Sequence, residues 1–265
     1  MTDALHDLGW QPFFADQVTP DDTGLVPLRI ASVHRTRLMA ETGSGQVRLD
    51  LPLHGTTADY AVGDWVLAQA DRRVIARRLD RKTLLRRRTE GAAGRQLIAA
   101  NVDTLFIVTS CNDDFNPARL ERYLALANEA GIRPVIVLTK IDMVDDPSGW
   151  LARARDLQRD LPVVALNAKS PDAASVLAPW CGPERTVALV GSSGVGKSTL
   201  LNTLADRASG PAQATGPVRA SDAKGRHTTT SRQMIVLPGV TGSSEGDSTN
   251  AKSSSGTVLI DTPGV

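Results

Sequence analysis

The sequence predicts an all-β barrel of the OB type followed by a mostly parallel, doubly wound α/β domain. Between Leu25 and about Arg87, short β-type segments alternate with turn residues, which is typical of a small barrel. From Val102 onward, apolar strand-like runs alternate with helix-like runs, which predicts a parallel sheet with right-handed crossovers. Within this second region, residues 191–198 read GSSGVGKS and fit the phosphate-binding loop pattern. The predicted class is therefore α/β, with a P-loop domain behind a barrel.

The composition is that of an ordinary globular protein. The 265 residues are 41% hydrophobic and 22% charged, which suits the two domains expected at this length. Cys111 and Cys181 stand far apart without the spacing of a metal site, so we expect two reduced thiols. The N-terminus does not resemble a signal peptide, and no apolar run approaches the ~18 residues of a membrane span. We expect a cytoplasmic monomer without a membrane partner.

The first 90 residues are expected to form a leader and the barrel. Residues 1–24 hold several aromatic and apolar side chains, which predict a short helix or a segment packed on a neighbouring domain. The barrel is expected at 25–90, with strands at 28–31, 33–39, 46–51, 63–68 and 74–79.

A basic cluster accompanies the end of the barrel. From Asp71 to Arg95, ten arginines and lysines are opposed by three carboxylates, a net charge of +7 in a chain whose total is +1. We interpret the cluster as an RNA-binding surface, because contacts of Lys and Arg with phosphates supply much of the affinity for nucleic acids. The alternative is a solvated strand edge whose charges discourage aggregation.

Residues 91–265 are expected to form the α/β domain, entered through a linker at 91–100. Strands are expected at 102–109, 134–138, 163–166 and 187–190. Helices are expected from Asn116-Pro117 to Gly131, over 148–160 and over 198–204. A hairpin pair is expected at 233–237 and 257–260, separated by a Gly/Ser/Thr-rich surface loop at 238–256 to which we assign no function.

The phosphate-binding loop has the strand before it and the helix after it that this motif requires. Its glycines let backbone N–H groups curl around a β-phosphate, and the helix N-terminus adds positive dipole. Lys197 is expected to reach the β- and γ-phosphates, and the Ser198 hydroxyl to ligate Mg²⁺. The alternative is a chance Gly-rich turn before a helix. The nucleotide-binding residues assigned here are Gly191, Ser192, Ser193, Gly194, Val195, Gly196, Lys197, Ser198 and Thr199.

Three further polar segments are expected at the carboxyl ends of strands, where ligands of open α/β sheets gather. Asp142 is suited to accept hydrogen bonds from the N1–H and 2-amino group of guanine, a donor pair that adenine lacks. Asp261 is suited to hold Mg²⁺ through water, and its segment to present a backbone N–H to a γ-phosphate. The residues assigned in these segments are Thr139, Lys140, Ile141 and Asp142; Asn167, Ala168 and Lys169; and Asp261 and Gly264.

Together these segments resemble the GTPase motifs, but in a permuted order. Residues 139–142 resemble G4 and 167–169 resemble G5; G1 follows at 191–198, G2 lies in 226–230, and G3 at 261–264. This order is a circular permutation of the Ras-like one. A circularly permuted Ras-like GTPase domain behind an OB barrel resembles the ribosome-small-subunit-dependent GTPase A family, over about residues 25–265.

The resemblance implies GTP or GDP with Mg²⁺ as ligands, and GTP hydrolysis in late maturation of the small (30S) ribosomal subunit. It implies that the subunit and its rRNA are partners and that the subunit stimulates turnover.

The resemblance also implies roles for the segment after the phosphate loop. Val265 stands where Ras-like enzymes place a water-orienting Gln, so His227 is implied to take over that role; the alternative is an exposed loop histidine without a catalytic task. Thr229, with Thr228 as the near alternative, is implied to ligate Mg²⁺ and to sense the γ-phosphate. The implied catalytic residues are His227, Lys197 and Thr229, and the implied metal ligands are Ser198, Thr229 and Asp261.

Three departures from the family pattern stand out. Thr139 replaces the Asn of G4, and Asn167 replaces the Ser of G5, whose contact with the base is made largely through the backbone of Ala168. Family members continue after G3 into a zinc-binding Cys/His domain, whereas this sequence stops at Val265 without such a cluster. We expect a fragment, the alternative being loss of that domain.

Two other functions remain open at this point. A P-loop ATPase requires selectivity for adenine, against which Asp142 argues. An RNA-binding assembly scaffold with a purely structural nucleotide predicts no turnover, even with small subunits present.

Overall fold

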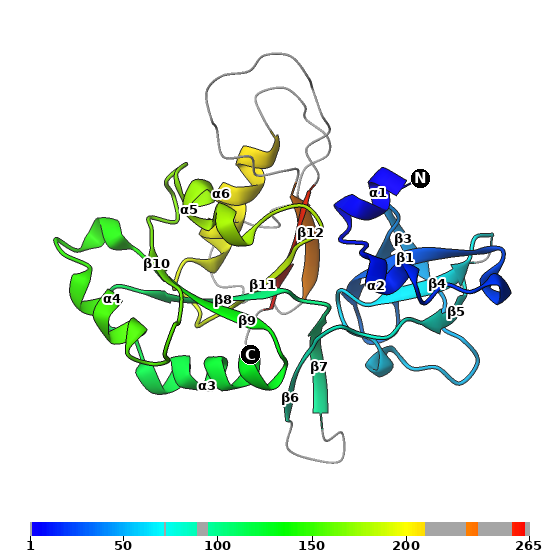
Figure 1. Ribbon diagram of the computed structural model, residues 1–265, viewed down its shortest axis with the longest axis horizontal. Coiled ribbons are helices and arrows are strands. Elements are labelled where there is room, and N and C mark those ends of the chain that lie inside the picture. Colours follow the sequence, from blue (N-terminus) through cyan, green and yellow to red (C-terminus); the bar gives the residue numbers. More distant parts are fainter. Residues whose placement is uncertain (1, 72, 89–94, 210–231, 238–255, 263–265) are drawn as a thin grey trace.

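The computed structural model describes residues 2–71, 73–88, 95–209, 232–237 and 256–262, and shows a barrel beside an α/β domain (Figure 1). One large sheet runs through both parts, with the strand order β10-β9-β8-β11-β13-β12-β1-β2-β3. Among the described helices, none combines the length and the apolar character needed to cross a membrane.

The α/β part of this sheet has five parallel strands and one antiparallel strand. The strands are β8 (Thr104–Ser110), β9 (Arg133–Thr139), β10 (Val163–Ala165), β11 (Thr186–Val190), β12 (Gln233–Leu237) and β13 (Thr257–Asp261). β12 runs antiparallel to β13 and forms with it the predicted pair, whereas β8 to β11 and β13 pair in parallel. Because the strands are parallel, the carboxyl ends of β9, β10, β11 and β13 lie along one edge.

Helices cover both faces of the parallel strands (Figure 1). One face carries α3 (Pro117–Glu129) and α4 (Ser148–Arg155), and the other carries α5 (Ala173–Leu177) and α6 (Lys197–Ser209). Successive strand residues point to opposite faces. Leu105 and Ile107 therefore share a core with Leu124 of α3, while Phe106 and Val108 share one with Leu200 of α6. This burial on both faces explains the continuous apolar runs of the sequence.

The structure confirms the predicted start of one helix, α3, but not the predicted end of another, α4. α3 begins as expected, because the Asn116 side chain accepts a hydrogen bond from the Arg119 N–H (3.0 Å) and Pro117 takes the first position. α4 ends at Arg155, so the helix predicted over 148–160 is too long. The chain leaves the helical conformation by Asp160, whose φ is 55°.

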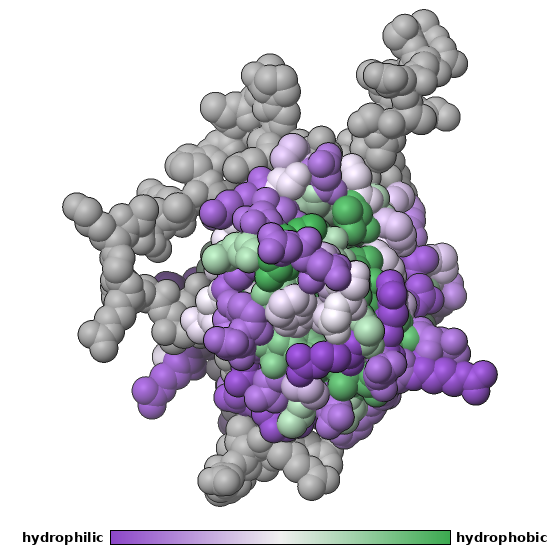
Figure 2. Space-filling model, turned by 90° about the vertical axis from the view of Figure 1, so that its left-hand side faces the viewer, coloured by the Kyte–Doolittle hydropathy of each residue, from purple (hydrophilic) through white to green (hydrophobic). Residues whose placement is uncertain are grey.

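Viewed from the side of the α/β domain, the surface is mainly hydrophilic, with small apolar areas between polar side chains (Figure 2).

Five strands close into the barrel predicted from the sequence. They are β1 (Leu25–Val33), β2 (Leu38–Glu41), β3 (Gln46–Leu49), β4 (Trp65–Gln69) and β5 (Ile75–Arg78). β1 pairs with both β2 and β4, β2 pairs with β3, and β4 pairs with β5. A parallel bridge between Asp50 and Val74 joins the ends of β3 and β5 and closes the ring. The closed five-stranded arrangement is that expected of an OB barrel.

The strand predicted over 33–39 is divided in the structure. The His34 N–H donates to the Arg37 carbonyl (2.9 Å) and closes a turn between β1 and β2. The barrel interior is aliphatic apart from one tyrosine, and its buried residues are Leu28, Ile30, Leu38, Ala40, Leu49, Tyr60, Val66, Ala68 and Ile75.

The leader forms short helices and also packs on the barrel, so it combines the two forms predicted for it. It holds α1 (Thr2–Asp7) and α2 (Pro12–Ala15), followed by a 3-10 turn at Pro20–Asp22. Trp10 meets Trp65 of β4 edge-on, with ring centroids 4.7 Å apart. Arg77 of β5 makes a bidentate ion pair with Asp22 (Nε–Oδ1 3.0 Å), and this guanidinium holds the pKa of the Asp22 carboxyl well below its usual range.

A second small sheet replaces the predicted linker. β6 (Leu84–Arg88) pairs antiparallel with β7 (Arg95–Ala100), so the prediction of a linker is wrong for residues 95–100. Leu85 and Ile98 on these strands are fully buried in the core that β8 and α3 share. This burial stabilises a strand where the sequence, rich in Ala and Gly, resembles a linker.

The side chain of Arg29 on β1 is fully buried where leader, barrel and α/β domain meet. Its guanidinium donates to the carbonyl of Leu8, to the carbonyl of Gly63 (3.3 Å) and to the Thr186 hydroxyl (2.9 Å). Leu8 belongs to the leader, Gly63 to the barrel, and Thr186 opens β11. Burial lowers the pKa of Arg29 to about 10, opposed by the negative charge of Asp103, so the group stays protonated at neutral pH.

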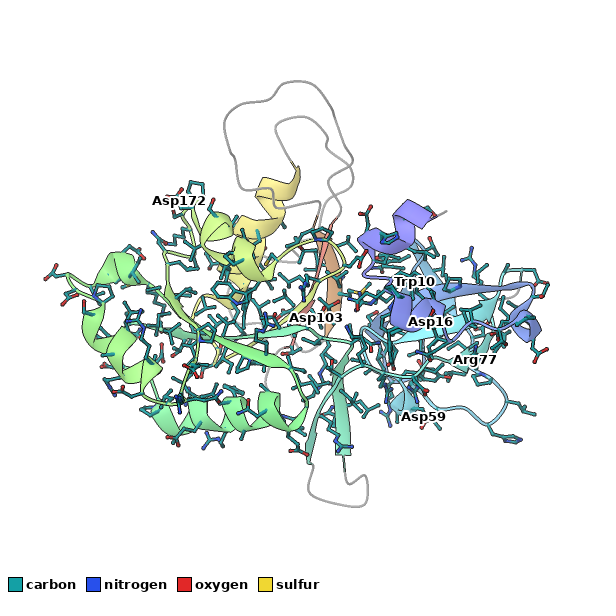
Figure 3. All side chains as sticks on the ribbon, in the orientation of Figure 1. Trp10, Asp16, Asp59, Arg77, Asp103 and Asp172 are labelled. Atoms are coloured by element: carbon teal, nitrogen blue, oxygen red, sulfur yellow. The ribbon has the colours of Figure 1, made fainter. Side chains whose placement is uncertain are left out.

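Asp103 extends this junction into the α/β domain. Its carboxylate accepts the Thr186 N–H (2.8 Å), and Lys82 Nζ lies 3.6 Å from the other carboxylate oxygen. Figure 3 shows Asp103 between the barrel and the α/β domain. β12 adds a backbone connection, because it pairs with β1 at Ser32 and Gln233. Side-chain and backbone contacts thus hold the two parts together.

We expect Arg29→Met to lower the free energy of unfolding by about 3 kcal/mol, because three buried acceptors each lose a hydrogen bond from the guanidinium. Urea denaturation followed by circular dichroism measures the change. Arg48→Met is the control: Arg48 on β3 is largely exposed, and we expect its loss to change stability by no more than ~0.5 kcal/mol. Equal midpoints for the two variants would refute the role given to Arg29.

Candidate functional site

Residues 191–198 connect the end of β11 to α6, as the phosphate-loop motif predicts. Gly191 has φ 147°, and a Cβ at this position would lie 2.2 Å from the Val108 carbonyl oxygen, so the loop needs glycine here. Val195 is buried and anchors the middle of the loop in the core. Ser193 and Gly194 are exposed at the tip. The loop is therefore fixed at its base and accessible at its tip.

Lys197 and Asp261 place opposite charges beside this loop. Lys197 Nζ donates to the carbonyls of Gly191 (2.7 Å) and Ser192 (2.6 Å). Asp261 ends β13, and its Oδ1 is buried without a hydrogen-bond partner in the described part of the chain. Burial lowers the pKa of Lys197 and raises that of Asp261, and the charge of each residue opposes the shift of the other. Such a pair is suited to bind an anion together with a cation.

The segment after β9 is tied to the phosphate loop through Thr139. The Thr139 side chain is fully buried, and its Oγ1 lies 2.5 Å from the Val195 carbonyl oxygen and 3.1 Å from that of Thr109. A Cβ built on Gly196, whose φ is 96°, would have Thr139 Oγ1 at 3.5 Å and the Ala168 methyl at 3.8 Å. Three predicted motifs therefore meet at Gly196. Thr139 acts here as a brace of the loop.

Exposure increases along the next residues of that segment: Lys140 and Ile141 are half-buried, and Asp142 is exposed. Lys140 adopts a left-handed conformation (φ 59°), and its Nζ lies 3.7 Å from Asp114 Oδ2. Ile141 and Asp142 follow in a single 3-10 turn, in which Asp142 is exposed. No described residue makes a hydrogen bond to the Asp142 carboxylate, which leaves its oxygens accessible to a ligand.

The segment after β10 is ordered by a hydrogen bond between one of its side chains and its own backbone. Asn167 Oδ1 accepts the Lys169 N–H (2.9 Å), which forms a local turn around the buried Ala168. Thr203 of α6 donates to the Ala168 carbonyl (2.7 Å), which ties this turn to the helix after the phosphate loop. The segment after β13 is held to β11, because the Thr262 hydroxyl donates to the Leu189 carbonyl (2.5 Å). The four predicted segments thus lie along one edge of the sheet.

Comparison with known proteins identifies this arrangement. Residues 78–265 match the family model described as RsgA GTPase. The chain belongs to the RsgA GTPase family. A Mesorhizobium japonicum protein named small ribosomal subunit biogenesis GTPase RsgA is 55% identical over 99% of this chain and 71% of its own length. A Vibrio parahaemolyticus protein named small ribosomal subunit biogenesis GTPase RsgA 2 is 43% identical over 98% of this chain and 67% of its own.

Solved structures support the same fold. YjeQ from Thermotoga maritima aligns with a TM-score of 0.59 at 22% identity, over 91% of this chain and 75% of that one. YloQ, described as a circularly permuted GTPase, aligns with a TM-score of 0.55 at 21% identity, over 93% of this chain and 74% of that one. The permuted fold predicted from the motif order is therefore confirmed, and this RsgA-family chain is a GTPase.

Several predicted site residues of this RsgA-family chain lie outside the described residues. His227, Thr228 and Thr229 fall in the segment 210–231, and Gly264 and Val265 follow the last described residue. The loop 238–256 is described only at Gly256. The roles given to His227, Thr228, Thr229 and Gly264 stay predictions.

The structure adds one residue that the sequence reasoning missed. Arg119, in the first turn of α3, donates through its guanidinium to the Ser192 hydroxyl of the phosphate loop. No motif contains Arg119. Its only signal in the sequence is its position just after the strand β8, whose carboxyl end lies at the same edge of the sheet.

Much of the basic cluster is used inside the fold. Arg81 makes a bidentate pair with the buried carboxylate of Asp64 (2.6 and 2.7 Å), just as Arg77 pairs with Asp22. Lys82 faces Asp103, and Arg87 donates to the Gln96 side chain (2.9 Å). The sequence count of +7 therefore overstates the charge that this region presents to a partner.

We expect Thr139→Val to weaken guanine-nucleotide binding roughly two- to tenfold, because Val keeps the shape but loses a hydrogen bond that braces the phosphate loop. Thr139→Asn should preserve binding, since an amide donor can reach the same carbonyls. Fluorescence titration with a labelled GDP measures both variants. Thr104→Val is the matched control, because Thr104 is equally buried but opens β8 at the opposite edge. An unchanged affinity of Thr139→Val would show that the brace is dispensable.

Proposed function

We propose that this GTPase acts in late maturation of the small ribosomal subunit, that the subunit stimulates its turnover, and that the barrel binds rRNA. The observation that carries the proposal is the backbone connection between the barrel and the nucleotide site. β12 follows the segment that holds His227 and Thr229, and it pairs directly with β1 of the barrel. The names of the relatives support the assignment to the small subunit. Nucleotide state and rRNA contact would thus be linked through one sheet.

Within the nucleotide site, we assign the phosphates to the loop 191–198 and to Lys197. The Ser198 hydroxyl and the Asp261 carboxylate are the described groups suited to Mg²⁺, which prefers oxygen ligands and uses few from the protein. The buried, unpartnered oxygen of Asp261 fits this assignment. No group of three His, Cys, Asp or Glu side chains gathers as a metal site among the described residues, so phosphate oxygens would complete the coordination. Bound Mg²⁺ would neutralise charge that develops on the phosphates.

For the base, we assign guanine recognition to Asp142 and to the backbone of Ala168. Asp142 is exposed and free to accept from the guanine N1–H and 2-amino group, and Thr139 positions its segment against the phosphate loop. Asn167 and Lys169 shape the turn that presents the Ala168 N–H. Thr229 is assigned to the switch that senses the γ-phosphate, with Thr228 as its alternative.

For rRNA, we assign the exposed arginines of the barrel, because several of the others have internal partners. Arg35 and Arg37 lie on the exposed turn between β1 and β2, and Arg73 lies exposed before β5. The leader (1–24), barrel (25–90) and GTPase domain (91–265) remain our proposed division, with β6 and β7 pairing across the second boundary.

The decisive experiment measures GTP hydrolysis by this chain with and without purified small ribosomal subunits, at two salt concentrations. We expect slow turnover alone, strong stimulation by small subunits, and weaker stimulation at the higher salt, because phosphate contacts are screened. Large subunits serve as the control. Absence of stimulation at either salt would favour an assembly scaffold with a structural nucleotide.

We expect His227→Ala to bind GTP normally but to hydrolyse it roughly a hundredfold more slowly with small subunits present, since the water loses its orienting group. Lys197→Ala should instead lose nucleotide binding. Single-turnover hydrolysis and labelled-nucleotide titration separate the two effects. His54→Asn is the control, because His54 is exposed on the barrel in a left-handed conformation that Asn tolerates. Unchanged turnover of His227→Ala would remove this residue from the mechanism.

A further inference from the structure

Arg119 is the described arginine that reaches the phosphate loop from outside the known motifs. It occupies the third position of α3, where the Asn116 cap fixes its backbone N–H. Its half-buried side chain crosses to the loop and donates to the Ser192 hydroxyl. The Ser192 carbonyl accepts Lys197 Nζ at 2.6 Å. Two cations, one from α3 and one from α6, therefore converge on the same loop residue.

The charge balance of Arg119 differs from that of the other inward-facing arginines. Arg77 and Arg81 have bidentate carboxylate partners, and the buried Arg29 has Asp103 and Asp64 near enough to influence its pKa. No described carboxylate lies within ion-pair distance of Arg119. A hydroxyl is a weak partner for a half-buried guanidinium, because a neutral acceptor does not compensate the charge. An anion beside Ser192 would compensate this charge.

The phosphates of the nucleotide are the anion that this position would meet, because the loop 191–198 wraps around them. We propose that Arg119 is a further phosphate-binding residue of this site: its guanidinium supplies a second positive charge after Lys197, and Ser192 positions it. The planar guanidinium suits phosphate oxygens, which accept two of its N–H groups side by side. The inference rests on the nucleotide site assigned above and adds a residue to it.

Nucleotide affinity of the isolated chain tests the proposal. Labelled GDP and GTP are titrated, at low and high salt, into the wild type, Arg119→Gln, Arg119→Lys and Ser192→Ala. We expect Arg119→Gln to weaken binding by tenfold or more and to reduce its salt dependence, because a charge has been removed from the site. Arg119→Lys should recover part of the affinity and the full salt dependence. Ser192→Ala should lose less affinity than Arg119→Gln, because the charge remains.

Arg122→Gln is the matched control, since it removes the same charge from an exposed position one turn along α3. It should bind as the wild type does. Thermal melting confirms that each variant is folded; if Arg119→Gln is not, Arg119→Lys and Ser192→Ala carry the comparison. The proposal is overturned if Arg119→Gln and Ser192→Ala lose equal affinity with unchanged salt dependence, since Arg119 would then only brace the loop. It is also overturned if Arg119→Lys binds no better than Arg119→Gln.

These measurements use no ribosomal subunits. A failure of subunit-stimulated hydrolysis would refute the proposed function while leaving the affinities of the Arg119 variants interpretable. Conversely, wild-type affinity in Arg119→Gln would overturn the phosphate role of Arg119 without bearing on the subunit.

Discussion

The buried guanidinium of Arg29 is the interaction on which the arrangement of this molecule depends. A buried charge is tolerated only where its hydrogen-bond donors are satisfied. Arg29 donates to acceptors on the leader, the barrel and β11. β11 leads directly into the phosphate loop, so the barrel is fixed against the strand that positions the nucleotide site. Asp103 and Lys82 complete the charge balance around this joint. In the proposed function, this junction is the physical connection between contact at the barrel and the GTPase domain.

The nucleotide site follows from the direction of the strands. Parallel pairing brings the carboxyl ends of β9, β10, β11 and β13 to one edge, although their segments are separated by up to about 120 positions in the chain. Close packing between the segments then fixes the position of the phosphate loop. Gly196 adopts a φ of 96°, which favours glycine, and Thr139 holds the loop beside it by donating to the Val195 carbonyl. Circular permutation leaves this geometry intact, because each segment depends on its strand and not on its order.

Local patterns predicted most of the elements. Alternating and continuous apolar runs located the strands of the barrel and of the α/β sheet, and Asn116-Pro117 marked the start of α3. The predictions were wrong where tertiary contacts override local preference. β7 forms from a linker-like segment because Leu85 and Ile98 are buried together, and α4 stops short of its predicted end. The net charge counted in the basic cluster overstates what it presents to solvent for the same reason, since its partners Asp22, Asp64 and Asp103 lie outside the basic run.

The sequence by itself determined the family and the permuted motif order, because these depend on short motifs with fixed spacing. The residues that the same motifs assign to phosphate, base and metal remain its predictions. Only the tertiary structure decided which arginines are consumed by internal ion pairs, that β12 pairs with the barrel, and that Arg119 reaches Ser192. Such facts depend on contacts between residues far apart in the chain. The sequence gives the chemistry of each residue. The spatial neighbours of a residue, and hence its burial and the charge it presents to solvent, are set only when the chain folds.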